Sequence, residues 1–446
     1  MWMAKAFNSW FSIPTDTRIL FSTRVLRLFG YGFLSVILAL YLGQLGLSEV
    51  SIGLLFTLTL LGDTVISLWI TTNADRFGRR RMLIAGAVLM ILAAVLFAIT
   101  RNYYLLLLAA MIGVISPSGN EVGPFLSIEQ ASLTQLVPDR QRTGIFAWYN
   151  LAGSFATATG ALVGGGLAQL LQGLGYTPVM SYRVVVLGYG LVGLIMIGLF
   201  RRLSTTIEAP AIELRAVPGG APAGTPAGNP GEEPAPHRFL GLYRSQKVVF
   251  RLAALFSLDS FAGGFVIQSM MALWFSLRFG VEPAVLGAIF FGANILAGIS
   301  ALSAAWVAGK IGLINTMVFT HLPSNVLLIL VPFMPNLTLA IALLLIRFSI
   351  SQMDVPTRQS YVMAVVAPDE RTAASGITNV ARTIGVSLSP VFSGIFLSNP
   401  AFLGVPFVIS GSLKIVYDLA LYFNFRSVKP PEEQQSQPTS EKENGG

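Results

Sequence analysis

Long apolar segments of similar length, separated by short polar stretches, dominate this chain. The segments run from residue 20 to residue 424 and carry few or no charged positions. Each is roughly 20 residues long, which is the length of helix that crosses the hydrocarbon core of a bilayer. We read twelve spans, at about residues 20–43, 50–71, 82–100, 103–134, 143–170, 182–201, 248–278, 283–307, 314–334, 336–364, 372–397 and 402–424. The pattern therefore predicts an all-α membrane protein with about twelve transmembrane helices.

Prolines occur in two of the longest spans. Pro117 and Pro124 lie in the fourth span, and Pro356 lies in the tenth. Neighbouring helices can satisfy the backbone groups that a proline frees in a membrane helix. We therefore expect these spans to be kinked but continuous.

Two polar segments interrupt the apolar pattern and predict the domain organisation. Residues 203–247 include the run "APAIELRAVPGGAPAGTPAGNPGEEPAP", whose Pro, Gly and Ala content is typical of a flexible linker. Residues 427–446 are polar and typical of a disordered tail. We expect an N-terminal six-helix bundle at 1–202, a linker at 203–247, and a C-terminal six-helix bundle at 248–426.

The positions of Lys and Arg in the loops predict the orientation, because cytoplasmic loops carry an excess of both. If both termini are cytoplasmic, the inner loops contain Arg76, Arg79, Arg80, Arg81, Arg140, Arg142, Arg201, Arg202, Arg215, Arg238, Arg244, Lys247, Lys310 and Arg371. The outer loops then contain Arg101, Arg183 and Arg278. We expect a multi-pass protein of the plasma (inner) membrane, with the linker, the tail and both termini in the cytoplasm.

Composition narrows the classes of function. Charged residues make up 11% of the chain, against about 25% in soluble domains, and the mean hydropathy is +0.69. The absence of Cys excludes disulfides, thiolate metal sites and cysteine nucleophiles. The net charge of +8 comes mostly from the loops, so we expect no nucleic-acid partner. No phosphate-binding G-x-x-x-x-G-K-[ST] motif and no metal-hydrolase spacing occurs. We expect neither an enzyme nor a cofactor or metal site.

The two halves of the chain resemble each other. "GLSEVSIGLL" at 46–55 parallels "GVEPAVLGAI" at 280–289, an offset of 234 residues. "EQASLTQLVPDRQRTGIFAWYNLAGS" at 129–154 parallels "RQSYVMAVVAPDERTAASGITNVART" at 358–383, an offset of 229 residues. Parallel repeats of six helices are typical of transporters whose substrate site lies near the membrane midplane. The repeat predicts two pseudo-symmetric bundles.

A charged turn between the second and third spans carries a family resemblance. "ADRFGRRR" at 74–81 is similar to the G-x-x-x-D-R-x-G-R-[RK] loop of the major facilitator superfamily, with a Thr in place of the leading Gly. The matching residues are Asp75, Arg76, Gly78, Arg79 and Arg80. The resemblance covers roughly residues 18–426 and implies the fold of that superfamily.

The resemblance also implies a role for the turn. In that family the acidic residue faces the N-terminus of another helix and holds the halves together in the outward-facing state. A carboxylate is stabilised there by the helix dipole. Gly78 permits the tight turn. We expect Asp75, Arg76, Gly78, Arg79 and Arg80 to form a conformational gate, while the arginines also anchor the cytoplasmic side.

Two glycine-containing segments resemble a motif of proton-coupled exporters in the same superfamily. "GALVGG" at 160–165 has the motif's glycines but Ala161 in place of its proline. Its repeat partner "SPVFSG" contains Pro390 and Gly394. The candidate positions are Gly160, Gly164, Gly165, Pro390 and Gly394. Two alternatives stay open for them, an exporter-specific role and close helix packing.

Charged residues at membrane depth are the candidate coupling and substrate sites, because each one costs about 2.5–3.5 kcal/mol to insert. They are Asp63, Glu121, Glu129, Asp259, Arg347, Asp354, Arg358 and Arg382. Asp63 and Glu121 have no basic partner in the sequence nearby, so we expect them to carry the proton. Asp354 and Arg358 are four residues apart, as are Lys414 and Asp418, and we expect both pairs to neutralise themselves. His321 is interpreted as a polar packing residue.

Two further pairs follow from the repeat. Arg27 and Asp259 occupy equivalent positions at an offset of 232 residues, and Glu129 and Arg358 at 229. We expect each pair to bridge the two halves, as a gate or as a brace.

These features predict a monomeric secondary transporter that binds a small molecule. The preferred mechanism is proton antiport, exporting a drug-like or cationic solute. One alternative is uptake of a small anionic solute bound by Arg347, Arg358 and Arg382. Another is a non-transporting receptor or scaffold on the same fold.

Overall fold

The computed structural model describes residues 14–137, 139–208 and 242–426. Most of the expected linker, residues 209–241, and the whole expected tail, residues 427–446, lie outside the described residues. Within the described ranges, eleven helical segments are long and apolar enough to cross a membrane. The all-helical prediction is therefore confirmed.

The first half of the chain contains seven α-helices in the described residues. They are α2 (Thr15–Gln44), α3 (Glu49–Phe77), α4 (Arg79–Ile99), α5 (Tyr103–Ile112), α6 (Phe125–Leu136), α7 (Asp139–Gly173) and α8 (Pro178–Phe200), followed by the short 3₁₀ helix η1 (Thr205–Ile207). The first long spans end at polar turns as the hydropathy pattern predicts.

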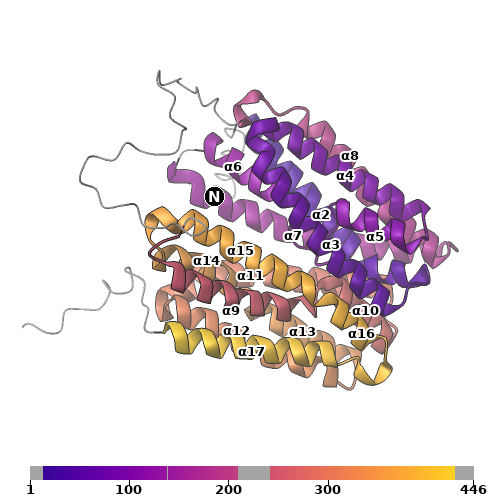
Figure 1. The fold of residues 1–446 in the computed structure, drawn as a ribbon. Helices are drawn as coiled ribbons and strands as arrows, with labels where there is room; N and C mark the ends of the chain where they lie inside the picture. The colour runs from indigo at the N-terminus through magenta and orange to yellow at the C-terminus, as the bar shows by residue number, and fades with distance from the viewer. Residues whose placement is uncertain (1–13, 138, 209–241, 427–446) are drawn as a thin grey trace, which may run out of the picture.

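The second half repeats this order with more interruptions. It contains α9 (Gln246–Gly264), α10 (Gln268–Phe279), α11 (Pro283–Ile311), α12 (Leu313–Leu330), η2 (Val331–Phe333), α13 (Leu337–Ile350), α14 (Asp354–Val365), η3 (Pro368–Glu370), α15 (Arg371–Leu388), α16 (Pro390–Leu397), η4 (Pro400–Phe402) and α17 (Val405–Phe425). Figure 1 shows the two halves lying side by side as separate groups of helices.

We name the two ends of the helix bundles by the positions of the first and last described helices. The terminal end is where α2 begins and α17 ends, and the far end is opposite (Figure 1). The helices run alternately between these ends.

The fourth expected span is broken, which corrects the prediction of a kinked helix over 103–134. Residues 113–124 between α5 and α6 are not helical. Gly119 and Gly123 in this segment have φ of +71° and +83°, which favour glycine. Side chains satisfy the freed carbonyls: the Tyr31 hydroxyl donates to the Val122 carbonyl at 3.0 Å, and the Tyr189 hydroxyl donates to the Val114 carbonyl. Such support makes irregular backbone tolerable at membrane depth.

The tenth span is interrupted as well. α13 ends at Ile350 and α14 begins at Asp354, with a turn between them. Pro356 lies in the first turn of α14, where its missing N–H costs no helical hydrogen bond. The continuous helix expected over 336–364 is therefore two helices.

Contacts between the halves gather toward the far end. Val391 donates its backbone N–H to Thr57 Oγ1 at 3.1 Å. Gln268 donates to Ser35 Oγ at 2.8 Å, and the Ser269 hydroxyl donates to the Ser35 carbonyl at 2.6 Å. These residues join α2 and α3 to the C-terminal half. The far end is closed in this structure.

Candidate functional site

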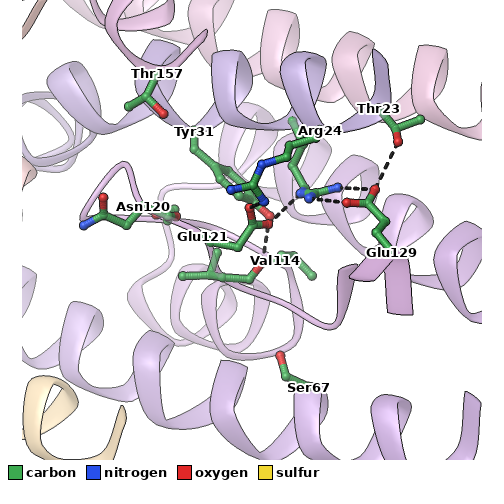
Figure 2. Close-up of polar contacts among 12 residues, drawn as sticks. Thr23, Arg24, Tyr31, Ser67, Val114, Asn120, Glu121, Glu129 and Thr157 are labelled. Carbon is green, nitrogen blue, oxygen red and sulfur yellow. Dashed lines mark hydrogen bonds and ion pairs between the residues drawn. The ribbon is translucent and has the colours of Figure 1, made fainter. Parts of the chain in front are cut away.

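A buried cluster of opposite charges lies where the fourth span is broken. Arg27 reaches Glu129 at 2.7 Å and Glu121 at 2.7 Å. Arg24 reaches Glu121 at 2.8 Å. Figure 2 shows the two carboxylates, with Glu121 on the non-helical segment and Glu129 on α6, facing the arginine side chains of α2. We call these four residues the N-terminal quartet.

Neighbouring side chains stabilise the quartet through hydrogen bonds and a cation–π contact. Thr23 donates to Glu129 at 3.0 Å, and the Tyr149 hydroxyl donates to the same carboxylate. The Arg24 guanidinium lies 4.2 Å from the centre of the Tyr149 ring. Arg27 and Glu129 are fully buried, whereas the Glu121 side chain is 15% exposed. Glu121 is therefore the acid of the quartet that is open to its surroundings.

These contacts correct two expectations. Glu121 was expected to lack a basic partner, but two arginines contact it because the break at 113–124 turns it toward α2. Arg27 was expected to pair with Asp259 across the halves, yet it pairs within its own half. The same holds for Glu129, whose partner is Arg27 and not Arg358.

Asp63 occupies a different place on α3. It accepts a hydrogen bond from Ser67 one turn later, at 3.4 Å, and takes no part in the ion pairs found among the described residues. The expectation of a carboxylate without a basic partner therefore matches the described geometry for Asp63. Its candidate role stays a proposal.

The C-terminal half contains a second ion-pair network. Asp259 of α9 contacts Lys414 of α17 at 2.5 Å and Arg358 of α14 at 3.2 Å. Arg358 also contacts Asp354 at 3.1 Å, as the spacing of four residues predicted. The expected Lys414–Asp418 pair is wrong: Lys414 is held by Asp259, and Asp418 contacts His321 at 2.8 Å.

The two networks are related by the repeat with their charges exchanged. Arg27 pairs with Glu129 in one half, and the equivalent Asp259 pairs with Arg358 in the other. The repeat thus conserves the contact between the helices but reverses its polarity. This explains why equivalent positions carry opposite charges without bridging the halves.

Two arginines of the C-terminal half are not part of its ion pairs. Arg347 of α13 is 7% exposed, and its buried Nε has no hydrogen-bond partner within the described residues. Arg382 of α15 donates to the Ser260 hydroxyl at 3.2 Å. A buried cation without a carboxylate is costly, so both are suited to meet an anionic group.

The charged turn at 74–81 is positioned by a residue that sequence reasoning missed. The Glu208 carboxylate accepts the backbone N–H groups of Arg79 at 2.6 Å and Arg80 at 3.3 Å, at the N-terminus of α4. Asp75 instead pairs with Arg79 at 2.7 Å and is 64% exposed. Gly78 has φ +97°, as the expected tight turn requires.

The gate role of this turn stays a prediction. Asp75 does not lie at the N-terminus of another helix in this structure, where the far end is closed. Arg80 donates to the carbonyls of Arg201 at 2.6 Å and Leu203 at 3.2 Å. The turn is anchored to the segment after α8, and Arg76 lies over the Phe77 ring at 5.5 Å.

The glycine-containing segments allow close helix packing. A Cβ at Gly160 or Gly164 would meet the backbone of α2 at Phe29 or Phe33. At Gly165 it would meet the Pro283 carbonyl of α11, and at Gly394 it would meet the Glu49 carbonyl of α3. Pro390 starts α16 and its carbonyl lies against Gly53. Gly165 and Gly394 thus pack the halves together near the far end.

Arg24 and Glu208, which were not predicted as site residues, have only weak signals in the sequence. Arg24 stands near the start of the first span, where a positive-inside anchor explains it equally well. Glu208 lies beyond the sixth span in "STTIEAP", which resembles any polar connection. Only the fold brings these residues to their partners.

Relatives and solved structures provide independent comparisons. The chain is 32% identical to an uncharacterized membrane protein of Saccharomyces cerevisiae, over 93% of this chain and 94% of that protein. It is 25% identical over 152 residues to the Quinolone resistance protein NorA of Staphylococcus aureus, covering 34% of this chain and 38% of that protein.

Solved transporters share the fold. The structure matches a bacterial homologue of the human lysosomal transporter Spinster, in an inward-facing and occupied conformation, with a TM-score of 0.69 and 16% identity over 92% of this chain and 96% of that one. It also matches a D-xylose-proton symporter with a TM-score of 0.66 and 15% identity, over 91% and 97% of the chains.

The family model of the Major Facilitator Superfamily matches residues 20–390. This range includes the charged turn, the N-terminal quartet and most of the C-terminal network. The chain therefore belongs to the major facilitator superfamily. The family match and the solved transporters that share its fold indicate a membrane transporter rather than an enzyme.

Proposed function

We propose that the chain is a proton-coupled secondary transporter that exports a small organic solute by alternating access. The observation that carries this proposal is the N-terminal quartet, which places a partly exposed carboxylate between two arginines at a break in a membrane span. Broken spans at the repeat interface are where substrates and coupling ions bind in such transporters.

Glu121 can couple the binding of a proton to the binding of the substrate, because protonation changes its contacts with the two arginines. Its two oxygens bind Arg24 and Arg27, and protonation would weaken both contacts at once. The arginines would then reorganise around Glu129, which is held by Thr23 and Tyr149. Asp63, which has no basic partner among the described ion pairs, is the second carboxylate proposed to bind a proton or a cationic group.

The direction of export rests on a partial likeness. The Quinolone resistance protein NorA, to which 34% of this chain is similar, is named for resistance to quinolones. Resistance of that kind fits outward transport of a drug-like molecule.

A second candidate is proton-coupled uptake of a small anionic solute. It is favoured by Arg347 and Arg382, two arginines at membrane depth that lie outside the ion pairs found among the described residues. An anionic substrate would supply the charge that the buried Arg347 lacks.

Orientation and assembly complete the proposal. The charges in the loops support a terminal end in the cytoplasm of a plasma-membrane protein, and with this orientation the structure, closed at its far end, is inward-facing. Residues 203–247 then act as a cytoplasmic linker between the bundles 1–202 and 248–426, and the transporter works as a monomer.

Inside-out membrane vesicles with an acidic interior test the proposal. We expect the fluorescent cation ethidium to accumulate in vesicles that contain the full chain. Asp63→Asn and Glu121→Gln should each lower the initial rate at least about tenfold, whereas Glu282→Gln, at an exposed carboxylate in a loop, should not. Uptake of the anion carboxyfluorescein into right-side-out vesicles under an inward proton gradient, without ethidium accumulation, would favour the second candidate and contradict export.

A further inference from the structure

The C-terminal half contains a buried titratable pair outside the N-terminal quartet. His321 of α12 places Nδ1 2.8 Å from Asp418 of α17, and Asn325 donates to the other carboxylate oxygen at 2.8 Å. Asp418 is fully buried and His321 is 3% exposed. The pair therefore lies inside the helix bundle, between α12 and α17.

In the C-terminal ion-pair network, the charge balance allows the His321–Asp418 pair to bind a proton. Asp259 and Asp354 are matched by Lys414 and Arg358 through direct contacts. Asp418 is the third acid, and its basic contact is His321. Imidazole is the side chain that gains its charge near neutral pH, so a proton on His321 neutralises the buried carboxylate.

Other ionisable groups near the pair have their own partners or stand farther off. The groups facing it are Lys414 and Tyr417 on α17, Asp259 on α9 and Asp354 on α14. The buried Nε of Arg347 on α13 has no hydrogen-bond partner among the described residues, and Lys310 of α11 lies over the Trp306 ring at 3.8 Å. His321 is the member of this set whose charge is free to change with a modest change in pH.

Polar groups continue from the pair toward the far end. Ser410, Lys414 and Asp418 are spaced by four residues, so they follow one face of α17. Ser410 Oγ, Ser324 Oγ and Asn325 Oδ1 are buried and have no hydrogen-bond partner in the described part of the chain. Buried polar atoms normally have a hydrogen-bond partner, so these three atoms provide sites for transient hydrogen bonds.

A cavity meets the same helix interface at the far end. Its volume is about 270 Å³, and its lining includes Pro332 and Phe333 after α12 together with Gly404, Val405 and Val408 at the start of α17. Trp274 and Arg278 of α10 also line it. From Val408 to Asp418 the distance along the helix is about 15 Å at 1.5 Å per residue. The cavity, the unpartnered polar atoms and the His321–Asp418 pair thus lie in sequence along one interface.

We propose that His321 and Asp418 form a second proton-binding site of this transporter, in addition to the carboxylates of the N-terminal half, and that protons reach it from the far end between α12 and α17. This route is separate from the interface between the halves, which is closed at the far end. A proton could therefore enter from outside while the substrate site faces inward. The inference rests on the proposed proton coupling and adds a C-terminal site to Asp63 and Glu121.

The first experiment measures the response of the conformation to pH. The chain has no Cys and two His residues, His321 and His237, the latter outside the described residues. Ile311→Cys at the terminal end, labelled with bimane, reports opening in the purified full chain without any substrate. We expect a fluorescence change between pH of about 8 and about 6 that is kept in His237→Gln and reduced at least about fivefold in His321→Gln and in Asp418→Asn.

The second experiment tests the route. In proteoliposomes, an acid jump applied on the far side should trigger the fluorescence change. Val408→Trp, at the cavity, should slow it at least about tenfold, whereas Val416→Trp, at a position 54% exposed on the same helix, should not.

The outcomes separate this inference from the proposed function. An unchanged response in a monodisperse, folded His321→Gln protein, lost instead in Asp63→Asn, would overturn the C-terminal site and leave proton coupling intact. Absence of any response in the parent chain would overturn both. An unaltered rate in Val408→Trp would overturn the far-end route.

Discussion

At the scale of single residues, the central feature is that the buried ion pairs form within each half and not between the halves. Sequence reasoning located nearly all of them, because a charge inside an apolar span is conspicuous. It did not find their partners, since these depend on the rotation and depth of helices about 100 residues apart in sequence. Glu121 shows this most clearly: nothing near it in the sequence is basic, and two arginines of α2 contact it.

The fully buried Arg27–Glu129 pair provides a prediction at this scale. Arg27→Gln or Glu129→Gln leaves one buried charge without its partner, which typically costs about 3–5 kcal/mol of stability. The double variant removes both charges and should lose less than either single variant. Thermal unfolding of the purified proteins measures this, with Arg202→Gln, at an exposed arginine after α8, as a control. Additive losses in the double variant would contradict the pairing.

At the scale of elements, the hydropathy pattern predicted most spans but missed the breaks. The sequence of residues 113–124 contains two prolines and three glycines, and two of the glycines, Gly119 and Gly123, adopt positive φ. Proline alone is compatible with a kinked membrane helix, so the pattern did not distinguish a kink from a break. The hydroxyls that support the broken segment, from Tyr31 and Tyr189, come from other helices and leave no local signal.

Adjacent glycines of α7 provide a matched test of packing between the halves. A Cβ at Gly165 would meet the Pro283 carbonyl and Gly287 of α11, whereas at Gly166 nothing lies within 4 Å. Gly165→Ala should disfavour the closed far end by about 1–3 kcal/mol, as overpacking does. Gly166→Ala gains the same helix propensity without the clash.

The distance between spin labels at Leu174→Cys and Phe402→Cys, two exposed positions at the far end, reads out this change. It should be longer in Gly165→Ala than in the parent chain and unchanged in Gly166→Ala. Equal distances in all three proteins would show that α7 and α11 do not close the far end at this point.

Glu370 lies outside the membrane-spanning segments and stabilises the residues directly before α9. Burial raises the pKa of its carboxyl group, but the backbone N–H groups of Tyr243, Arg244 and Ser245 more than offset this, so the pKa falls to about 2 from 4.5. A lowered pKa means that the contact stabilises the fold fully above pH 4.5 and is lost as pH falls toward about 2.

Glu370→Gln should therefore lower the melting temperature at pH 7, and the difference from the parent chain should shrink below pH 4.5. Asp369→Asn, at the exposed neighbour that accepts a hydrogen bond from the Tyr243 hydroxyl at 2.6 Å, should have a smaller effect. A difference that grows on acidification would contradict the sign of this contribution.

At the scale of the whole molecule, the repeat explains both the fold and the arrangement of charge. Equivalent helices carry Arg27–Glu129 in one half and Asp259–Arg358 in the other, so these ion pairs lie within a half and do not tie the two halves together. The sequence predicted the repeat and the superfamily resemblance. It did not predict which end is closed, because both conformations use the same helices and differ only in contacts between the halves.

Distances between spin labels test alternating access most directly. Phe77→Cys and Ile311→Cys form an exposed pair at equivalent repeat positions on the terminal end, and Leu174→Cys and Phe402→Cys form one at the far end. The native absence of Cys makes each pair specific. On lowering the pH from about 8 to about 6, we predict that the terminal-end distance shortens while the far-end distance lengthens. If both distances stay constant, or change in the same direction, alternating access coupled to protons is contradicted.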